Sequence, residues 1–347
     1  MTADTTGTGH AVPHHGELLQ GVFRDGRGRT CPGLVTLPMP PELGLGSRAE
    51  FTPLPAGGPD GLTVEPPDRA KALRAARLAL AACAARGIRS AGAPGAPGAG
   101  RLRLTGTVPV GLGMGSSTSD VLATIRAVTA SHRVALTPPE IARLAVAAEN
   151  ASDPLMLDDR PALFAQREGR VLEILGDALP PAVVVGCATG GGRPVDTLSL
   201  PADAYRATDL PAFQRLRDLL RRAVAGADTA LLGRVCTASA TRHQRLLAKE
   251  ELPDLLAIAA ETGAAGVQIA HSGNVAGLLF APELPDLPRR LDRCVRALER
   301  LGIPLTHTFT TRQTRDERVS HHVRPCRRRD RRPGPDTPRT RTGLPAL

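Results

Sequence analysis

The stretch Val108–Asp120, VPVGLGMGSSTSD, places three glycines and four hydroxyl residues directly before a segment with helical periodicity. Glycines allow backbone N–H groups to turn towards an anion without a clash from Cβ. The N-terminus of the helix that follows adds free N–H groups and the positive end of the helix dipole. Hydroxyl oxygens are ligands that Mg²⁺ accepts. The stretch therefore predicts an anion-binding loop, and the alternative is a glycine-rich turn in which Ser117 or Thr118 only caps the helix.

Three kinds of phosphate loop contain closely spaced glycines, and the sequence separates them. A P-loop needs a lysine directly after its last glycine, and no lysine lies within thirty residues of this loop. A dinucleotide loop needs G-x-G-x-x-G and an acidic residue about twenty residues further on. Here the glycines fall at 111, 113 and 115, and no such acidic residue ends a second strand. The third pattern, P-x-G-x-G-x-G-S-S-[ST], matches at every position.

This third pattern resembles the phosphate loop of the GHMP kinases, the family of galactokinase, homoserine kinase and mevalonate kinase. The resemblance implies that the loop binds ATP together with Mg²⁺. The cofactor-binding residues that it implies are Pro109, Gly111, Gly113, Met114, Gly115, Ser116, Ser117 and Thr118.

A second motif, PHHGELLQG at 13–21, resembles the opening motif of one branch of that family, the L-threonine kinases of cobalamin assembly. Their motif reads P-x-x-x-G-E-[LIW]-x-Q-G, whereas here two residues rather than three separate Pro13 from Gly16. The resemblance implies that Glu17 and Gln20 face the phosphoryl acceptor. A carboxylate suits an ammonium group, and an amide can hydrogen-bond a carboxylate.

The same motif contains the histidine pair His14 and His15. Adjacent side chains on a strand point to opposite faces, so at most one of the two points into the site. We name His15 as the substrate-binding candidate, although the pattern does not decide between the two. The alternative is that both lie in a solvated loop.

A third motif, ENASDPLM at 149–156, resembles the E-P-[ST]-D motif of the threonine-kinase branch: Glu149 and Asp153 match, and Asn150 departs. The resemblance implies that Glu149 holds Mg²⁺ together with Ser117, and that Asp153 lies beside the acceptor hydroxyl. A carboxylate there can take the proton that the acceptor loses as the bond to phosphorus forms. We therefore name Asp153, Glu149 and Ser117 as catalytic. The alternative for Asp153 is that it only ends the helix before the following proline.

A fourth segment, GVQIAHSGNVAGLLF at 266–280, resembles the C-terminal glycine motif of the same branch. The resemblance implies that Gly273 and Gly277 allow a tight turn between two strands against the phosphate loop. His271, Ser272 and Gly273 are the substrate-binding candidates of this segment. A hairpin turn without a ligand is the alternative.

The elements that must position these residues follow from periodicity and end signals. We expect a helix over 68–87 with Asp68 as N-cap, a second from about Ser117 to Ser131, and a third that Thr137 caps. Residues 101–108 alternate as a half-buried strand, and 211–262 has a helical pattern in about three pieces. The order of elements predicts an α+β protein of two domains.

The GHMP resemblance makes this fold more specific. It implies an N-terminal domain like the second domain of ribosomal protein S5 and a ferredoxin-like C-terminal domain. The expected organisation is a disordered start at 1–10, an ATP-binding domain at 11–180, a C-terminal domain at 181–311 and a disordered basic tail at 312–347.

The formal charge of +10 belongs mostly to that tail, whose eleven arginines and four acidic residues carry +7. The chain has no tryptophan, one tyrosine and six phenylalanines, so it lacks the stacking platforms that single-stranded nucleic acids use. We therefore expect no nucleic-acid partner, with binding through the arginine-rich tail as the alternative.

Cysteine usage and apolar runs indicate the compartment. The six cysteines form no CxxC pair, which favours a reducing environment. No apolar run reaches the roughly 18 residues of a membrane span, and the first residues lack the features of a signal peptide. We expect a cytoplasmic protein with no membrane partner, able to form a homodimer.

Together the motifs predict a kinase that transfers the γ-phosphoryl group of ATP to the hydroxyl of a small hydroxy amino acid. L-threonine, giving O-phospho-L-threonine for the cobalamin side chain, is the acceptor that the branch resemblance implies. The alternatives are a homoserine kinase or another GHMP small-molecule kinase of secondary metabolism, and a catalytically silent GHMP-fold protein that binds a nucleotide.

Overall fold

The computed structural model describes residues 6–54, 61–87, 99–108, 112–158, 160–190, 205–271 and 273–311. The expectations for Pro109, Gly111 and Ser272 lie outside these residues, as do those for residues 1–5 and for the tail at 312–347. All described residues belong to one compact unit.

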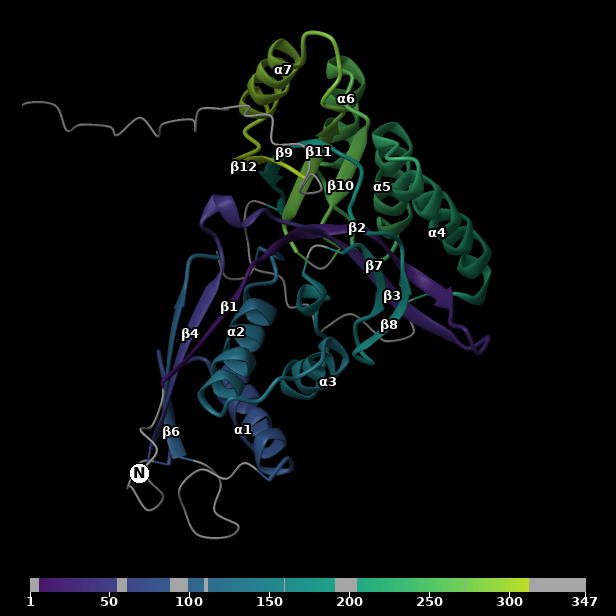
Figure 1. Ribbon diagram of the computed structural model, residues 1–347. Helices are drawn as coiled ribbons and strands as arrows, with labels where there is room; N and C mark the ends of the chain where they lie inside the picture. The colour runs from purple at the N-terminus through teal and green to yellow at the C-terminus, as the bar shows by residue number, and fades with distance from the viewer. Residues whose placement is uncertain are drawn as a thin grey trace, which may run out of the picture. The chain divides into compact units, whose positions relative to one another are not determined.

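Four strands and three helices form the part of the described chain that carries the glycine loop. The strands lie in the order β1-β4-β6-β5, antiparallel except for the parallel pair β5–β6. Helix α2 packs against β1 and β4, and α1 and α3 pack against α2 (Figure 1). The bounds are β1 Gly7–Ala11, β4 Ser47–Leu54, β5 Leu62–Glu65, β6 Ala99–Gly106, α1 Ala70–Ala84, α2 Ser116–Ser131 and α3 Pro138–Glu149.

Strand β1 corrects the expectation that residues 1–10 form a disordered start. Gly7–Ala11 pairs with β4 and lies against α2. A Cβ on Gly7 would lie 2.2 Å from the Ala127 oxygen, and one on Gly9 would lie 2.1 Å from the Ala123 oxygen. Gly7 and Gly9 therefore let a helix backbone approach the strand closely.

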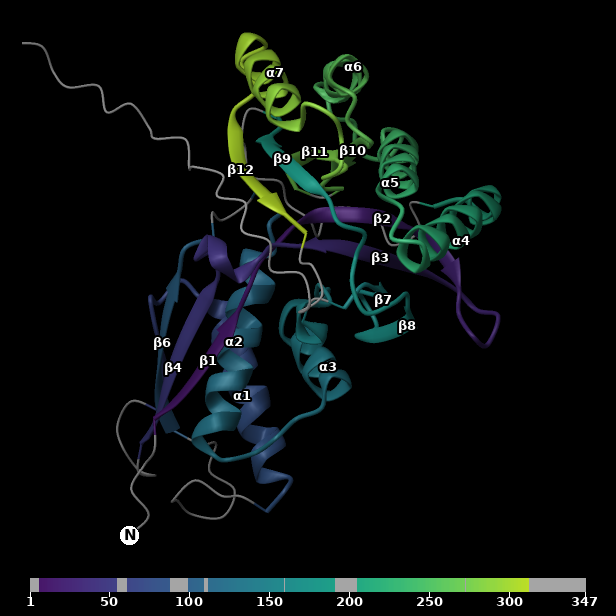
Figure 2. The same ribbon diagram turned by 45° about the horizontal axis from the view of Figure 1, so that its top comes forward.

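Eight further strands form one sheet in the order β12-β9-β11-β10-β2-β3-β7-β8, with every pair antiparallel. Helices α4 to α7 lie over one side of this sheet, as the two views show (Figures 1 and 2). The bounds are β2 His14–Arg24, β3 Thr30–Pro38, β7 Ala162–Ala165, β8 Arg170–Ile174, β9 Val183–Ala188, β10 Gly266–Ile269, β11 Val275–Phe280, β12 Leu305–Thr310, α4 Leu210–Ala225, α5 Thr229–His243, α6 Leu252–Thr262 and α7 Leu287–Arg300.

This sheet continues across the domain boundary that we expected at residue 180. Strand β2 belongs to the expected N-terminal domain, yet it pairs with β10 through Glu17 and Ile269. The α+β class is confirmed, and the three helical pieces expected within 211–262 are α4, α5 and α6. The two expected domains share a sheet because β2 finds its partner about 250 residues away, a pairing that no local pattern reveals.

Strand β2 is buried on both faces, whereas antiparallel strands commonly have one face exposed to solvent. Leu18 and Leu19 are both fully buried and belong to the apolar cluster shared with α4 and α5. Since His14 and Glu17 lie on the same strand, the hydrophobic core holds their backbone in place.

Two helix starts test the cap predictions. Thr137 caps α3 as expected, with a capping box to Glu140 and prolines in the first turn. Asp68 does not cap α1, whose N-cap is Arg69 without a side-chain bond. The N–H of Arg69 donates to the Pro66 oxygen, so Asp68 lies inside a turn and the helix begins after it.

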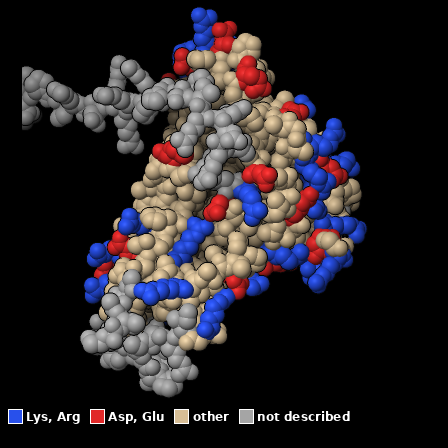
Figure 3. All heavy atoms as spheres, in the orientation of Figure 1, with Lys and Arg blue, Asp and Glu red and all other residues tan. Residues whose placement is uncertain are grey.

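Charged side chains of both signs are interleaved over α4 (Figure 3). Glu173 accepts from Nε of Arg217 and from Nε of Arg221, each at 2.6 Å. Arg221 also bonds to Asp218. These arginines are therefore partnered within the chain. None of the described helices is long and apolar enough to cross a bilayer.

Candidate active site

The glycine loop leads directly into α2, and residues 114–118, at its described end, have backbone donors without a partner among the described residues. Gly113 and Gly115 have φ of +77° and +70°, a region that favours glycine. Within the part of the chain that the structure describes, no hydrogen bond engages the N–H groups of residues 114–118. The loop therefore directs unpaired donors and the positive end of the α2 dipole to one place, as an anion site requires.

The loop is held between the start of β2 and the turn after β10. The N–H of His14 donates to the Met114 oxygen at 3.2 Å, and that of Asn274 donates to the Leu112 oxygen at 2.8 Å. A Cβ on Gly113 would lie 2.2 Å from Cα of Gly273, so the two backbones touch. The expected packing of the Gly273 turn against the phosphate loop is therefore present.

The last residue of α3, Glu149, is buried and meets the first turn of α2. Ser117 Oγ donates to one carboxylate oxygen and Thr118 Oγ1 to the other, each at 2.8 Å. Burial raises the pKa of Glu149 to about 7, although both hydroxyls favour its ionised form. A buried carboxylate next to a hydroxyl oxygen is a ligand set of the kind that Mg²⁺ prefers, so Ser117 and Glu149 fit the predicted metal site.

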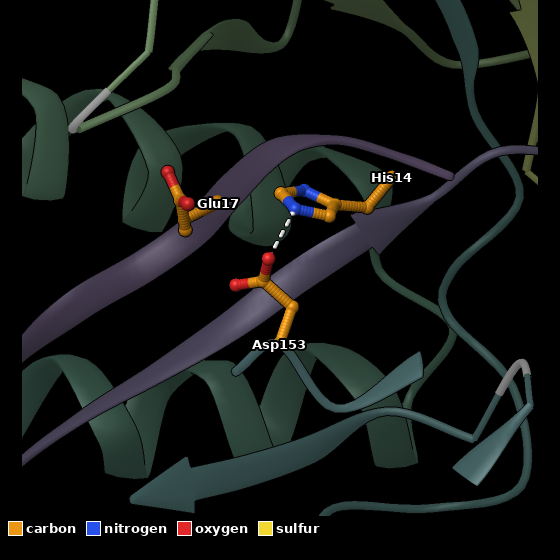
Figure 4. A group of neighbouring side chains, drawn as sticks. All are labelled: His14, Glu17 and Asp153. Carbon is orange, nitrogen blue, oxygen red and sulfur yellow. Dashed lines mark hydrogen bonds and ion pairs between the residues drawn. The ribbon is translucent and has the colours of Figure 1, made fainter. Parts of the chain in front are cut away.

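Asp153 follows four residues later, after Asn150 ends α3 with φ of +69°. Nε2 of His14 lies 3.0 Å from Oδ2 of Asp153, and Thr118 Oγ1 lies 3.4 Å from the same oxygen. The Asp153 side chain is 21% exposed, and its Oδ1 has no hydrogen-bond partner among the described residues. One oxygen is thus held by the protein while the other is open to a substrate (Figure 4).

The His14–Asp153 pair perturbs both side chains. Burial alone would lower the pKa of His14, but the charge and hydrogen bond of Asp153 outweigh it and raise that pKa to about 9. Burial alone would raise the pKa of Asp153, but the charge of His14 outweighs it and lowers that pKa. At neutral pH the pair is an imidazolium beside a carboxylate.

His14, not His15, faces this site, which corrects our choice between the two. Nδ1 of His15 lies 3.2 Å from Gln268 Oε1, and its Nε2 lies 3.3 Å from Thr306 Oγ1. Burial, the largest cause, lowers the pKa of His15 to about 4, so it is neutral. The rule that adjacent side chains alternate holds, but the side on which the site lies depends on tertiary packing.

Glu17 and His271 form a buried pair next to His14 and Asp153. The backbone N–H of His271 donates to Glu17 Oε2 at 2.8 Å, and Nδ1 of His271 lies 3.3 Å from it. Nε2 of His271 lies 3.2 Å from Ser239 Oγ. With both ring nitrogens engaged, His271 supports Glu17, whereas one Glu17 oxygen lies within 4.8 Å of the ligand atoms of His14 and Asp153.

Gln20 lies further along β2. Its backbone N–H donates to Ser239 Oγ at 3.2 Å, and its side-chain Oε1 is buried without a hydrogen bond to another described group. A buried amide oxygen without a partner costs free energy unless something fills the position. The Gln20 side chain lies beside Tyr205, on whose hydroxyl it acts, and its Oε1 is an acceptor without a partner among the described groups.

Our sequence analysis missed the two lysines. The ammonium of Lys249 donates to the Gly273 oxygen at 2.6 Å and to Asn274 Oδ1 at 3.2 Å, so it holds the turn that touches the phosphate loop. The positive charge of Lys71, on α1, favours the ionised forms of both Glu149 and Asp153 and so opposes the effect of burial on their pKa values. The rarity of lysine was a signal in the sequence, because arginine occupies 42 of the 44 Lys and Arg positions and lysine only these two.

Comparison with known proteins finds a family model that matches part of this chain. The sequence profile of the GHMP kinases N terminal domain matches residues 74–165. Residues 74–165 are thus similar to this domain. The match runs from α1 to β7 and so includes the glycine loop, Glu149 and Asp153.

Two curated relatives are L-threonine kinases. The protein from Citrobacter freundii is 30% identical over 183 residues, which cover 52% of this chain and 62% of the relative. The protein from Salmonella typhimurium is 28% identical over 192 residues, which cover 54% and 62%. The matched part therefore spans less than two thirds of each relative.

Solved structures agree on the fold. The homoserine kinase from Cytophaga hutchinsonii superposes with a TM-score of 0.62 at 14% identity, covering 90% of this chain and 96% of that one. This likeness in fold covers most of the chain and so extends well beyond residues 74–165.

Proposed function

We propose that this chain is an ATP-dependent kinase that phosphorylates the hydroxyl group of a small hydroxy amino acid, with L-threonine as the first acceptor to test. The observation that carries the proposal is the convergence of three features: free loop amides, the Ser117–Glu149 pair, and Asp153 with one open oxygen. Phosphoryl transfer needs these three parts: an anion cradle, a metal ligand set, and a group that positions the attacking hydroxyl.

Each part has a role in the transfer. The amides of residues 114–118 hold the polyphosphate of ATP, and the α2 dipole offsets its charge. Mg²⁺ held by Ser117 and Glu149 would neutralise charge that develops on the phosphate oxygens. Asp153 Oδ1 accepts the proton of the acceptor hydroxyl as the oxygen–phosphorus bond forms.

The acceptor is inferred from chemistry next to Asp153 and from the relatives. Glu17 offers a carboxylate for an ammonium group, and Gln20 offers an amide for a carboxylate. Both groups lie on β2 beyond His14. The two curated relatives are named L-threonine kinases. These facts support O-phospho-L-threonine as the product, and with it a role in cobalamin side-chain assembly.

The test is a phosphoryl-transfer assay with ATP, Mg²⁺ and a panel of L-threonine, L-serine and L-homoserine. We expect the highest kcat/KM with L-threonine and losses of about 10²-fold or more in Asp153→Asn. A higher kcat/KM for homoserine would assign the homoserine kinase alternative. Nucleotide binding without transfer to any of the three would overturn the proposal in favour of a silent GHMP-fold protein. We also propose that the protein is cytoplasmic and forms a homodimer.

A further inference from the structure

We propose that His14 is a positioning residue for the transfer: its imidazolium holds Asp153 ionised and oriented, so that catalysis depends on a proton that His14 carries. This inference rests on the proposed function for its kinetic consequence, but the state of His14 can be measured without activity. Nothing in the motifs assigned this role, since the pattern did not decide between His14 and His15.

The two contacts of the ring define its protonation. Nδ1 of His14 lies 3.1 Å from the Gly16 carbonyl oxygen, which can only accept, so Nδ1 carries a hydrogen. Nε2 lies 3.0 Å from Asp153 Oδ2. Two lone pairs would repel at this distance, so a proton lies between these atoms as well. Oδ2 also faces the hydroxyl of Thr118, which favours placing that proton on nitrogen.

The glycine loop leaves the space that the ring occupies. A Cβ on Gly115 would lie 2.5 Å from Cδ2 of His14, 2.8 Å from its Nε2 and 3.5 Å from Oδ2 of Asp153. Gly115 therefore has a role besides its positive φ and its place at the start of α2. The absence of a side chain there lets an imidazole from β2 reach an aspartate that follows α3.

The charges around the pair favour the charged ring. Asp153 and Glu17 both raise the pKa of His14. His15 is neutral, and the charge of Lys71 acts on Asp153 in the same direction as His14 does. Asp153 disfavours the ionised form of Glu149, because the two carry like charges. His14 thus offsets the negative charge of Asp153, which lies close to the buried Glu149.

The proton balance separates His14 from the base. In the transfer, the acceptor O–H bond breaks and its proton moves to Asp153 Oδ1 while the oxygen bonds to the γ-phosphorus of ATP. The bond from that phosphorus to the bridging oxygen breaks, and ADP leaves with the electron pair. Asp153 then returns its proton to solvent. His14 keeps its own proton throughout, so it acts through Asp153.

A metal ion is the competing occupant of the same place. His14, Glu17 and Asp153 offer ligand atoms that all lie within 4.8 Å of one another (Figure 4). A transition metal would need the lone pair of Nε2, which the proton occupies in our proposal. Proton and metal therefore exclude each other, and a single set of measurements distinguishes them.

The experiment compares the wild type with His14→Gln and with His15→Gln, a matched control on the same strand. We expect the wild-type kcat to fall on the alkaline side near pH 9, where His14 loses its proton. In His14→Gln we expect kcat to fall by about 10²-fold, the KM for ATP to change by less than about threefold, and the alkaline limb to disappear. His15→Gln should keep the limb. His14→Lys, which retains a cation, should restore part of kcat and move the limb to higher pH.

A measurement that does not depend on activity tests the protonation of His14 separately from the proposed kinase function. ¹⁵N NMR of labelled histidine should show His14 titrating near pH 9 in the wild type and at a clearly lower pH in Asp153→Asn, where burial still lowers its pKa but the charge of Asp153 no longer raises it. An alkaline limb unchanged in His14→Gln, a wild-type titration near 6.5, or a Co²⁺ absorption band that requires His14 would each overturn the proposal. Absence of turnover with the expected NMR titration would overturn only the proposed function.

Discussion

Replacing Glu149 with glutamine is expected to make the protein more stable and inactive at the same time. The carboxylate is buried at the junction of α3 and α2, and both its oxygens accept from hydroxyls. Hydroxyl groups can turn to accept from an amide, so glutamine can keep both contacts. The substitution therefore removes a buried charge without leaving a partner unpaired, whereas it takes away the ionised oxygen that Mg²⁺ needs.

The magnitude follows from the pKa of Glu149, which is raised from its ordinary 4.5 to about 7. The native protein binds this proton more tightly than the unfolded chain, so the contribution of Glu149 to stability is fully present below pH 4.5 and is lost as the pH rises through 7. At about 1.4 kcal/mol for each tenfold change in proton affinity, the loss amounts to about 3 kcal/mol at pH 7 and above, and about 1 kcal/mol at pH 5. Glu149→Gln should regain up to that amount.

Urea denaturation of both proteins from pH 5 to pH 9, without Mg²⁺ or nucleotide, measures the difference. Glu140→Gln is the control on the same helix, because backbone and side-chain bonds of Thr137 lower the pKa of Glu140. Its substitution should destabilise the protein above the pKa of the unfolded chain, the opposite sign. Mg²⁺ should stabilise the wild type and leave Glu149→Gln unchanged. Equal stability of wild type and Glu149→Gln at pH 8 would refute the reasoning.

Three further changes test the packing and chemistry of the site. Gly113→Ala should lower kcat/KM by at least about tenfold, because its Cβ meets Gly273, whereas Gly28→Ala, with φ of +78° and open space, should only lose about 1 kcal/mol of stability. Urea denaturation and steady-state kinetics separate the two. Lys249→Met should destabilise the protein by about 1–3 kcal/mol and raise the KM for ATP, since the Gly273 oxygen loses its donor. Asp153→Asn should lower kcat by about 10²- to 10⁴-fold with little change in the KM for ATP, and an effect confined to KM would exclude a role in the chemical step.

Local sequence signals predicted the helices and the glycine loop because their causes are local. The cap at Thr137 depends on Glu140 three residues away, and both lie in one turn. The cap at Asp68 failed for an equally local reason, since the turn that begins at Pro66 contains Asp68. The strand at Gly7–Ala11 was missed because the contacts of Gly7 and Gly9 with α2 are long-range and leave no local signal.

The sequence shows that side chains alternate along a strand, but it does not show which face of the strand meets the site. Alternation fixes that His14 and His15 point to opposite faces. Both faces of β2 are buried, so hydrophobicity does not identify the face that meets the phosphate loop. That face is set by contacts with Met114 and Asp153, which lie 100 and 139 residues away in the chain.

The site is therefore assembled from segments that no single motif joins. Strand β2 brings His14 and Glu17, the loop before α2 brings the free amides, the end of α3 brings Glu149 and Asp153, and the turn after β10 closes on Gly113. Because β2 pairs with β10 while its first residue bonds to the loop, a shift of that strand would move the acid, its partner histidine and the phosphate loop together. The buried apolar residues of β2 thus determine the distance between the predicted base and the predicted phosphate site, which is the distance that a transfer reaction depends on.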